Sequence, residues 1–240
     1  MPSIDPDTHL TIGALIFDDM DQCDFTGPFE ALSRVPNAIF KTIAKDSTPV
    51  RDLRGLRILP DLSIADAPQL DVLLVPGGYG QEALMDDEEV IEFLRRQASH
   101  ARYIFSVCTG ALLCGAAGLL EGKRATTHWT AMDVLPLYGA DPVNDRVVID
   151  GNLISTGGVT AGIDGSLIVV SLLRGNEAAE EIQLYMAYDP RTPFTAGSPE
   201  TAPPRVLRTV TERAKVITAQ RMDTGRHYQR SRHHETRADR

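Results

Sequence analysis

The feature that most constrains the fold is an apolar run that ends abruptly at a cysteine. Residues 103–107 are mostly apolar, Cys108 follows them, and residues 109–118 have the small-residue composition of a closely packed helix. A strand that turns directly into a helix places the side chain of the turn residue at the edge of a sheet. The free N–H groups and the positive end of the helix dipole favour a thiolate at that position. The pattern predicts that Cys108 is a nucleophile.

Strand patterns and helix patterns alternate along the chain. The predicted strands are residues 10–17, 38–44, 71–75 and 102–107, a hairpin within 50–60, and an antiparallel pair at 146–150 and 152–156. The predicted helices include one that begins at Thr26, with Pro28 in its first turn, and others at 86–101, 160–174 and 177–188. The alternation predicts an α/β fold with a doubly wound, mostly parallel sheet and helices on both faces. Sites in such sheets lie beyond the carboxyl ends of the strands.

Composition disfavours several classes of protein. The 240 residues are 42% hydrophobic, enough for one large domain. No apolar stretch approaches the roughly 18 residues that cross a bilayer, and residues 1–7 lack the pattern of a secretory signal. The cysteines Cys23, Cys108 and Cys114 form no paired-Cys motif, and phosphate-loop, dinucleotide-binding and HExxH motifs are absent. We therefore expect a cytoplasmic protein without membrane contact, metal or cofactor.

The net charge of −9 is unevenly distributed. Residues 205–240 contain ten basic and four acidic side chains, a local charge of +6, which leaves −15 on the remainder. An acidic main domain disfavours nucleic-acid binding. We expect an α/β domain over residues 8–204 and a C-terminal extension over 205–240. The extension is predicted to be a helix to residue 222, followed by a disordered basic tail.

An acidic residue follows the first predicted strand. Asp24 lies after the strand at 10–17, in a segment with several other carboxylates, so a solvated loop position is the alternative. A carboxylic acid kept protonated by burial near a thiolate can donate a hydrogen bond and then a proton. The sequence therefore makes Asp24 a candidate general acid, and Glu30 competes for the same role.

Two further segments carry candidate binding groups. Gly77 and Gly78 follow the strand at 71–75, and the N–H groups of Gly78 and Thr109 are expected to form an oxyanion-type hole. The Thr109 hydroxyl is a candidate for holding water or substrate. His128 ends a short predicted strand and is a possible accessory group for the cysteine. The alternatives are a tight turn for the glycines and a structural role for the histidine.

Four segments resemble the ThiJ/PfpI superfamily, whose members have the class I glutamine amidotransferase-like fold. They are residues 75–78, 106–110, 118–129 and 157–164, and the likeness extends from about residue 10 to about residue 204. Within that superfamily, residues 24–28 and 193–203 are similar to the isonitrile hydratase subgroup. Regulators with an AraC-type C-terminal domain share the Cys-Thr-Gly and Thr-Thr-His-Trp segments.

The resemblance implies a homodimer with its site near the subunit interface. Cys108 matches the family nucleophile and Asp24 matches the acidic residue that contacts it. Thr109 stands where protease-like members have a histidine, which removes the adjacent base and leaves His128 as the nearby candidate. The implied activity is hydration of small organic isonitriles to N-substituted formamides. The reaction would pass through a Cys108 thioimidate, with Asp24 as general acid and base.

Two other functions stay open. The first is a small-molecule-sensing regulatory protein without catalysis, although the 36 residues after Pro204 are too few for a two-motif DNA-binding module. The second is a glyoxalase or a redox-sensing thiol protein, which would use the same cysteine on a different substrate.

Overall fold

The computed structural model describes residues 4–238, with side chains as far as Arg232. Its central sheet contains β1 (Leu10–Leu15), β2 (Ala38–Ala44), β5 (Leu62–Ser63), β6 (Val72–Val75), β7 (Tyr103–Val107), β10 (Val147–Asp150) and β11 (Leu153–Thr156). The strand order is β10-β11-β7-β6-β1-β2-β5. All neighbours pair in parallel except β10 and β11. The predicted doubly wound α/β fold is confirmed.

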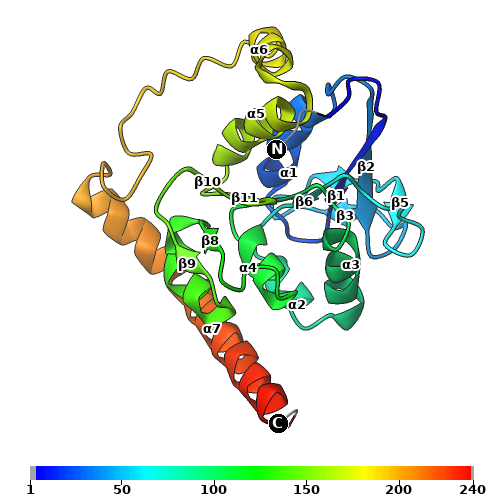
Figure 1. The fold of residues 1–240 in the computed structure, drawn as a ribbon. Coiled ribbons are helices and arrows are strands. Elements are labelled where there is room, and N and C mark those ends of the chain that lie inside the picture. The colour runs from blue at the N-terminus through cyan, green and yellow to red at the C-terminus, as the bar shows by residue number, and fades with distance from the viewer. Residues whose placement is uncertain (1–3, 239–240) are drawn as a thin grey trace.

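Helices cover both faces of this sheet (Figure 1). One face carries α1 (Gln22–Leu32), α5 (Ala161–Arg174) and α6 (Asn176–Tyr185), and the other carries α2 (Gln81–Leu84), α3 (Glu88–Ala98) and α4 (Gly110–Ala116). Every residue of β6 and β7 is buried, because a parallel strand between two helical layers needs apolar side chains on both sides.

Short elements complete the domain. The hairpin expected within residues 50–60 is present as β3 (Val50–Arg51) and β4 (Arg57–Ile58), which pair antiparallel. Beyond α4 lie β8 (Arg124–Ala125), β9 (Asp141–Pro142) and the 3₁₀ helix η1 (Trp129–Tyr138).

The first helix begins earlier than the sequence predicts. Asp21 is its N-cap, and the carboxylate of Asp21 accepts a hydrogen bond from the N–H of Cys23 at 3.2 Å. Thr26 is therefore inside α1, not at its start, and Pro28 is inside the helix as well. The expectation of a cap at Thr26 was wrong because a better capping carboxylate lies upstream. As a consequence, Asp24 occupies the first turn of a helix.

The C-terminal extension is one continuous helix, α7 (Pro204–Ala238). The prediction of a disordered tail from residue 223 is therefore wrong as far as residue 238, and residues 239–240 lie outside the described residues. The helix runs beside η1 (Figure 1), where the rings of Tyr138 and Tyr228 lie with centroids 4.9 Å apart. Packing against the domain stabilises a segment whose own composition favours disorder. The division of the chain at residue 204 remains a proposal.

Candidate functional site

Three adjacent strands end at one edge of the sheet, and the candidate residues follow them. Val75 of β6 pairs with Ser106 of β7, and β1 lies beside β6 in parallel. Gly77 and Cys108 therefore come directly after neighbouring strand ends, and α1 brings Asp24 to the same place. The site predicted beyond the carboxyl ends of the strands is assembled there.

Cys108 adopts a backbone conformation that residues other than glycine rarely adopt. Its φ is +56°, and its side chain is only 6% exposed. The N–H of Cys108 donates to the carbonyls of Thr156 and Gly157 at 3.1 and 3.0 Å. The Thr127 hydroxyl donates to the Cys108 carbonyl at 2.8 Å. These bonds hold a strained turn in place, so the thiol has a fixed position.

Asp24 is fully buried beside this thiol. Its Oδ2 accepts a hydrogen bond from the N–H of Gly77 at 3.0 Å, and its Oδ1 has no N–H or O–H donor among the described residues. Burial, helped by the nearby charge of Asp21, raises the pKa of Asp24 to about 8, although the bonds from Gly77 and Cys108 oppose the rise. Asp24 is therefore a neutral acid at pH 7.

Glu30, the competing candidate, points elsewhere. Its side chain is 51% exposed and forms an ion pair with Arg34 one turn along α1, at 2.6 Å. An exposed carboxylate on the far side of the helix cannot share a proton with Cys108. The structure excludes Glu30 from the role that the sequence left open.

The Cys108 thiol and the Asp24 carboxyl form a coupled pair. Burial and the Asp24 charge raise the pKa of Cys108 well above 9, whereas the N–H of Thr109 and the charge of Arg221 lower it. The pair therefore gives up its first proton near the pKa of Asp24. The charge that remains lies mainly on the carboxyl, because the pKa of Cys108 is the higher of the two, and the N–H of Thr109 and the charge of Arg221 favour its transfer to the sulfur.

The N–H groups expected to form an oxyanion-type hole, those of Gly78 and Thr109, have partners within the described chain. The N–H of Gly78 already donates to the Thr109 hydroxyl oxygen at 3.1 Å, and that hydroxyl donates to the Gly78 carbonyl at 3.3 Å. The N–H of Thr109 is directed at the Cys108 sulfur. Both groups therefore order the site itself, and the Thr109 hydroxyl ties the turn after β6 to the turn after β7.

His128 lines the same cavity as Cys108 but is oriented by a local turn. Its Nδ1 lies 2.8 Å from the Thr130 hydroxyl and accepts from the Thr130 N–H, so the side chain caps η1. Burial and the charge of Arg221 lower the pKa of His128 to about 4. The imidazole is neutral at pH 7, and within the described residues it makes no hydrogen bond to Cys108.

A cavity of about 310 Å³ opens onto Cys108. Its apolar walls come from distant parts of the chain and include Leu53, Tyr79, Val159 and Ile217. Arg221 also lines the cavity, from α7, and is only 3% exposed. The sequence did not single out Arg221, because a basic helix at the end of an acidic protein is most simply interpreted as solvated.

Gly78, in the turn after β6, lies so close to the backbone of Asp21 that a side chain would not fit there. Gly78 has a φ of +126°, and a Cβ there would lie 2.3 Å from the backbone nitrogen of Asp21. We expect Gly78→Ala to lower the free energy of unfolding by about 2 kcal/mol or more, measured by urea denaturation. Gly197→Ala is the control, because a Cβ at Gly197 meets no atom within 4 Å. Equal stabilities of the two variants would contradict this account of the turn.

Two general features of the described residues bear on function. Among them, no helix is both long enough and apolar enough to span a membrane. The same part of the chain contains no cluster of three or more His, Cys, Asp or Glu side chains arranged to hold a metal ion.

Two known proteins are similar to this chain in sequence. Isonitrile hydratase from Pseudomonas putida is 49% identical over 205 residues, which cover 85% of this chain and 90% of that protein. The HTH-type transcriptional regulator GbdR from Pseudomonas aeruginosa is 29% identical over 188 residues, and this chain spans 51% of its length.

The structure and the family model agree with these sequence matches. A ThiJ/PfpI family protein from Pseudomonas syringae has a TM-score of 0.89 at 38% identity, with 94% of this chain and 97% of that chain covered. The model of the DJ-1/PfpI family matches residues 11–171. The predicted resemblance is confirmed, and the chain belongs to the DJ-1/PfpI family.

Proposed function

We propose that this protein is an isonitrile hydratase, which adds water to organic isonitriles and releases N-substituted formamides. The observation that carries the proposal is a buried, neutral Asp24 beside a cysteine on a strained turn. Such a pair offers a nucleophile and a proton to one small electrophile. The 49% identity to isonitrile hydratase from Pseudomonas putida supports the same substrate class.

The first step joins the isonitrile carbon to the enzyme. The Cys108 thiolate attacks the terminal carbon of R–N≡C, and the Asp24 carboxylic acid delivers its proton to that carbon. The product is a thioimidate, R–N=CH–S–Cys108, and Asp24 is left as a carboxylate. Thr109 and Arg221 favour the thiolate that starts the step.

The second step releases the product. Asp24, now a carboxylate, takes a proton from water as the water oxygen attacks the thioimidate carbon. Asp24 then returns that proton to the nitrogen. As the tetrahedral adduct collapses, its hydroxyl gives its proton back to Asp24, the C–S bond breaks, and R–NH–CHO leaves with the thiolate restored. One isonitrile and one water give one formamide, and the pair regains its starting protonation.

The cavity is suited to this substrate class. Its volume of about 310 Å³ and its apolar walls fit a small alkyl or aryl isonitrile. The direct test is to incubate the protein with a series of such isonitriles and to measure formamide by mass spectrometry. We expect formamide to accumulate over many turnovers, and its absence across the series would refute the proposal.

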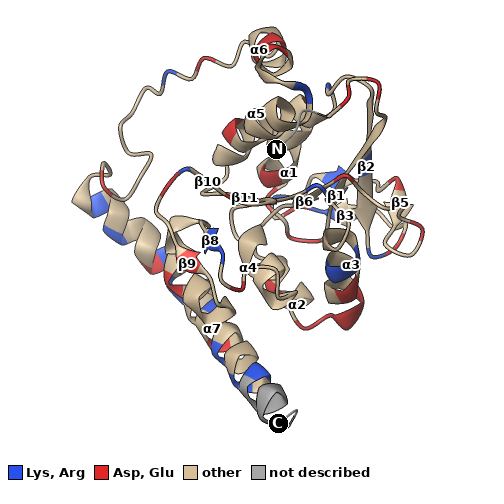
Figure 2. Ribbon diagram, in the orientation of Figure 1, with Lys and Arg blue, Asp and Glu red and all other residues tan. Residues whose placement is uncertain are grey.

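Two further assays test the alternative functions. Methylglyoxal replaces isonitrile in a second assay, and turnover of methylglyoxal alone would favour a glyoxalase. Salt-sensitive binding to duplex DNA would favour a regulator. Lys and Arg recur along α7 (Figure 2), but this single helix is what the structure describes after Pro204.

We also propose that the protein is a homodimer in a reducing compartment such as the cytoplasm. The side chains of Leu184, Tyr185 and Phe194 are 82%, 76% and 78% exposed in the single chain. Apolar side chains this exposed, on α6 and the loop after it, are typical of an interface. Light scattering gives the mass directly, and a monomer at micromolar concentration would contradict this proposal.

A further inference from the structure

Arg221 is a buried cation that forms no ion pair within 4 Å among the described residues. Its side chain is 3% exposed, and its Nε has no hydrogen-bond partner among the described residues. Its Nη2 reaches the Gly78 carbonyl at 3.5 Å, and its guanidinium lies 5.9 Å from the centre of the Tyr79 ring. Burying a charge is strongly unfavourable unless an opposite charge lies nearby. The position therefore favours a negative charge in the cavity that the guanidinium lines.

Charged and titratable groups from several elements surround Arg221, and the charge of Glu82 acts on it as well as that of Cys108. From α1, Asp24 is neutral at pH 7, and Asp21 is engaged in capping that helix. From α2, Glu82 accepts from Gln81 and Thr224 and forms no ion pair with Arg221 in the described chain. The ring of Tyr79 faces the guanidinium. The remaining groups are the neutral His128 and two exposed cations, Arg54 and Arg213.

We propose that Arg221 is a positioning residue whose guanidinium supplies the counter-charge of the Cys108 thiolate, so that α7 completes the reactive centre. Both side chains line one cavity. Burial lowers the pKa of Arg221 and raises the pKa of Cys108, and the attraction between the two groups opposes both shifts. A guanidinium keeps its charge at every accessible pH. The thiolate therefore has a permanent partner even though Asp24 lies beside it.

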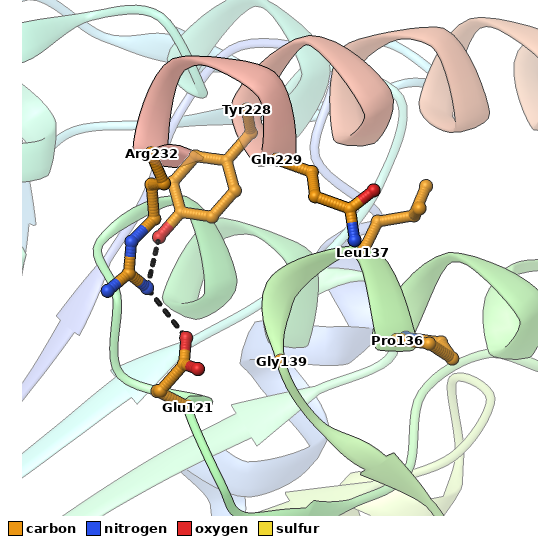
Figure 3. A pocket seen from close by; sticks show the side chains of 7 residues that line it. All are labelled: Glu121, Pro136, Leu137, Gly139, Tyr228, Gln229 and Arg232. Carbon is orange, nitrogen blue, oxygen red and sulfur yellow. Dashed lines mark hydrogen bonds and ion pairs between the residues drawn. The ribbon is translucent and has the colours of Figure 1, made fainter. Parts of the chain in front are cut away.

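The position of the guanidinium is fixed by the docking of α7. Figure 3 shows Arg232 between the hydroxyl of Tyr228 and the carboxylate of Glu121, at 3.4 and 2.6 Å. About two turns before Arg232, Gly225 lets the helix approach η1, because a Cβ there would lie 2.8 Å from Leu137. Contacts on the C-terminal side of Arg221 thus hold the helix against the domain. The side chain of Arg221 therefore has little freedom to turn toward a charge outside the cavity.

The test follows the reactivity of Cys108 itself and does not depend on the substrate. Neutral iodoacetamide alkylates thiolates, and mass spectrometry of the Cys108 peptide gives its rate from about pH 6 to about pH 10. We expect Arg221→Met to move the midpoint of this profile up by about one pH unit, and to slow alkylation at pH 7 by about tenfold. Arg221→Lys keeps the charge and should keep the wild-type midpoint.

Arg226→Met is the matched control, since Arg226 lies on the same helix but is exposed and pairs with Asp223. Its profile should equal that of the wild type. An unchanged midpoint in folded Arg221→Met would overturn the proposal. So would an equal shift in Arg221→Lys, because the effect would then belong to packing and not to charge. If Arg221→Met does not fold, Arg221→Gln against Arg221→Lys makes the same comparison.

Discussion

Cys108→Ala is expected to lower isonitrile turnover by about 10⁴-fold or more. The substitution removes the sulfur that forms the covalent bond, and the remaining residues of the cavity contain no second nucleophile in its place. Formamide production measured over hours gives the residual rate. Intact-mass spectrometry of the wild type during turnover should show one added isonitrile mass, and this adduct should be missing from the variant.

Cys114→Ala is the matched control. Cys114 is also fully buried and lies on α4, six positions along the chain from Cys108, but it does not line the cavity. We expect the isonitrile turnover of Cys114→Ala to stay close to that of the wild type. Formamide production by Cys108→Ala at the wild-type rate would refute the covalent mechanism and leave hydration to Asp24 and water alone.

Asp24→Asn is expected to lower turnover by about 10²- to 10⁴-fold, because an amide cannot give its proton to the isonitrile carbon or take one from water. The variant keeps the shape of the side chain and is neutral, as Asp24 is at pH 7. In the wild type, kcat/KM should rise with pH through an apparent pKa of about 8, where the pair loses its first proton. Wild-type turnover in Asp24→Asn would contradict the assignment of the acid.

Stability measurements show whether Asp24→Asn remains folded, and they also test the raised pKa of Asp24. The pKa of Asp24 rises from 3.8 to about 8 on folding, so its contribution to stability is fully present below pH 4 and is lost as pH rises toward 8. The melting temperature of Asp24→Asn should therefore exceed that of the wild type more at pH 8 than at pH 5. An equal difference at the two pH values would mean that Asp24 titrates normally.

The sequence predicted most of the fold because the decisive signals are local. The apolar run before Cys108, the glycines after β6 and the helix pattern at residues 86–101 each depend on residues close together in the chain. The candidate acid Asp24 could be chosen because adjacent parallel strands end at one edge. Its place on a helix was missed, since Asp21 and Thr26 are both good caps and only the folded chain decides between them.

The C-terminal contribution to the site could not be predicted for a different reason. Arg221 lies in a basic segment, and its burial depends on Gly225 and Tyr228 packing against η1, which is far away in the sequence. A pattern of charges does not reveal which one of several arginines will face inward. The partner of the Gly78 N–H could not be predicted either. It is the hydroxyl of Thr109, which follows another strand of the sheet.

The position of α7 brings part of the cavity at Cys108 from a segment that follows every strand of the sheet. The last strand of the sheet ends at Thr156, whereas Arg221 and one wall of the cavity come from the final helix. A premature stop codon after α6 would spare every strand of the sheet and still remove the cation. Such an allele would therefore test the role of α7 at Cys108 without changing any strand of the sheet.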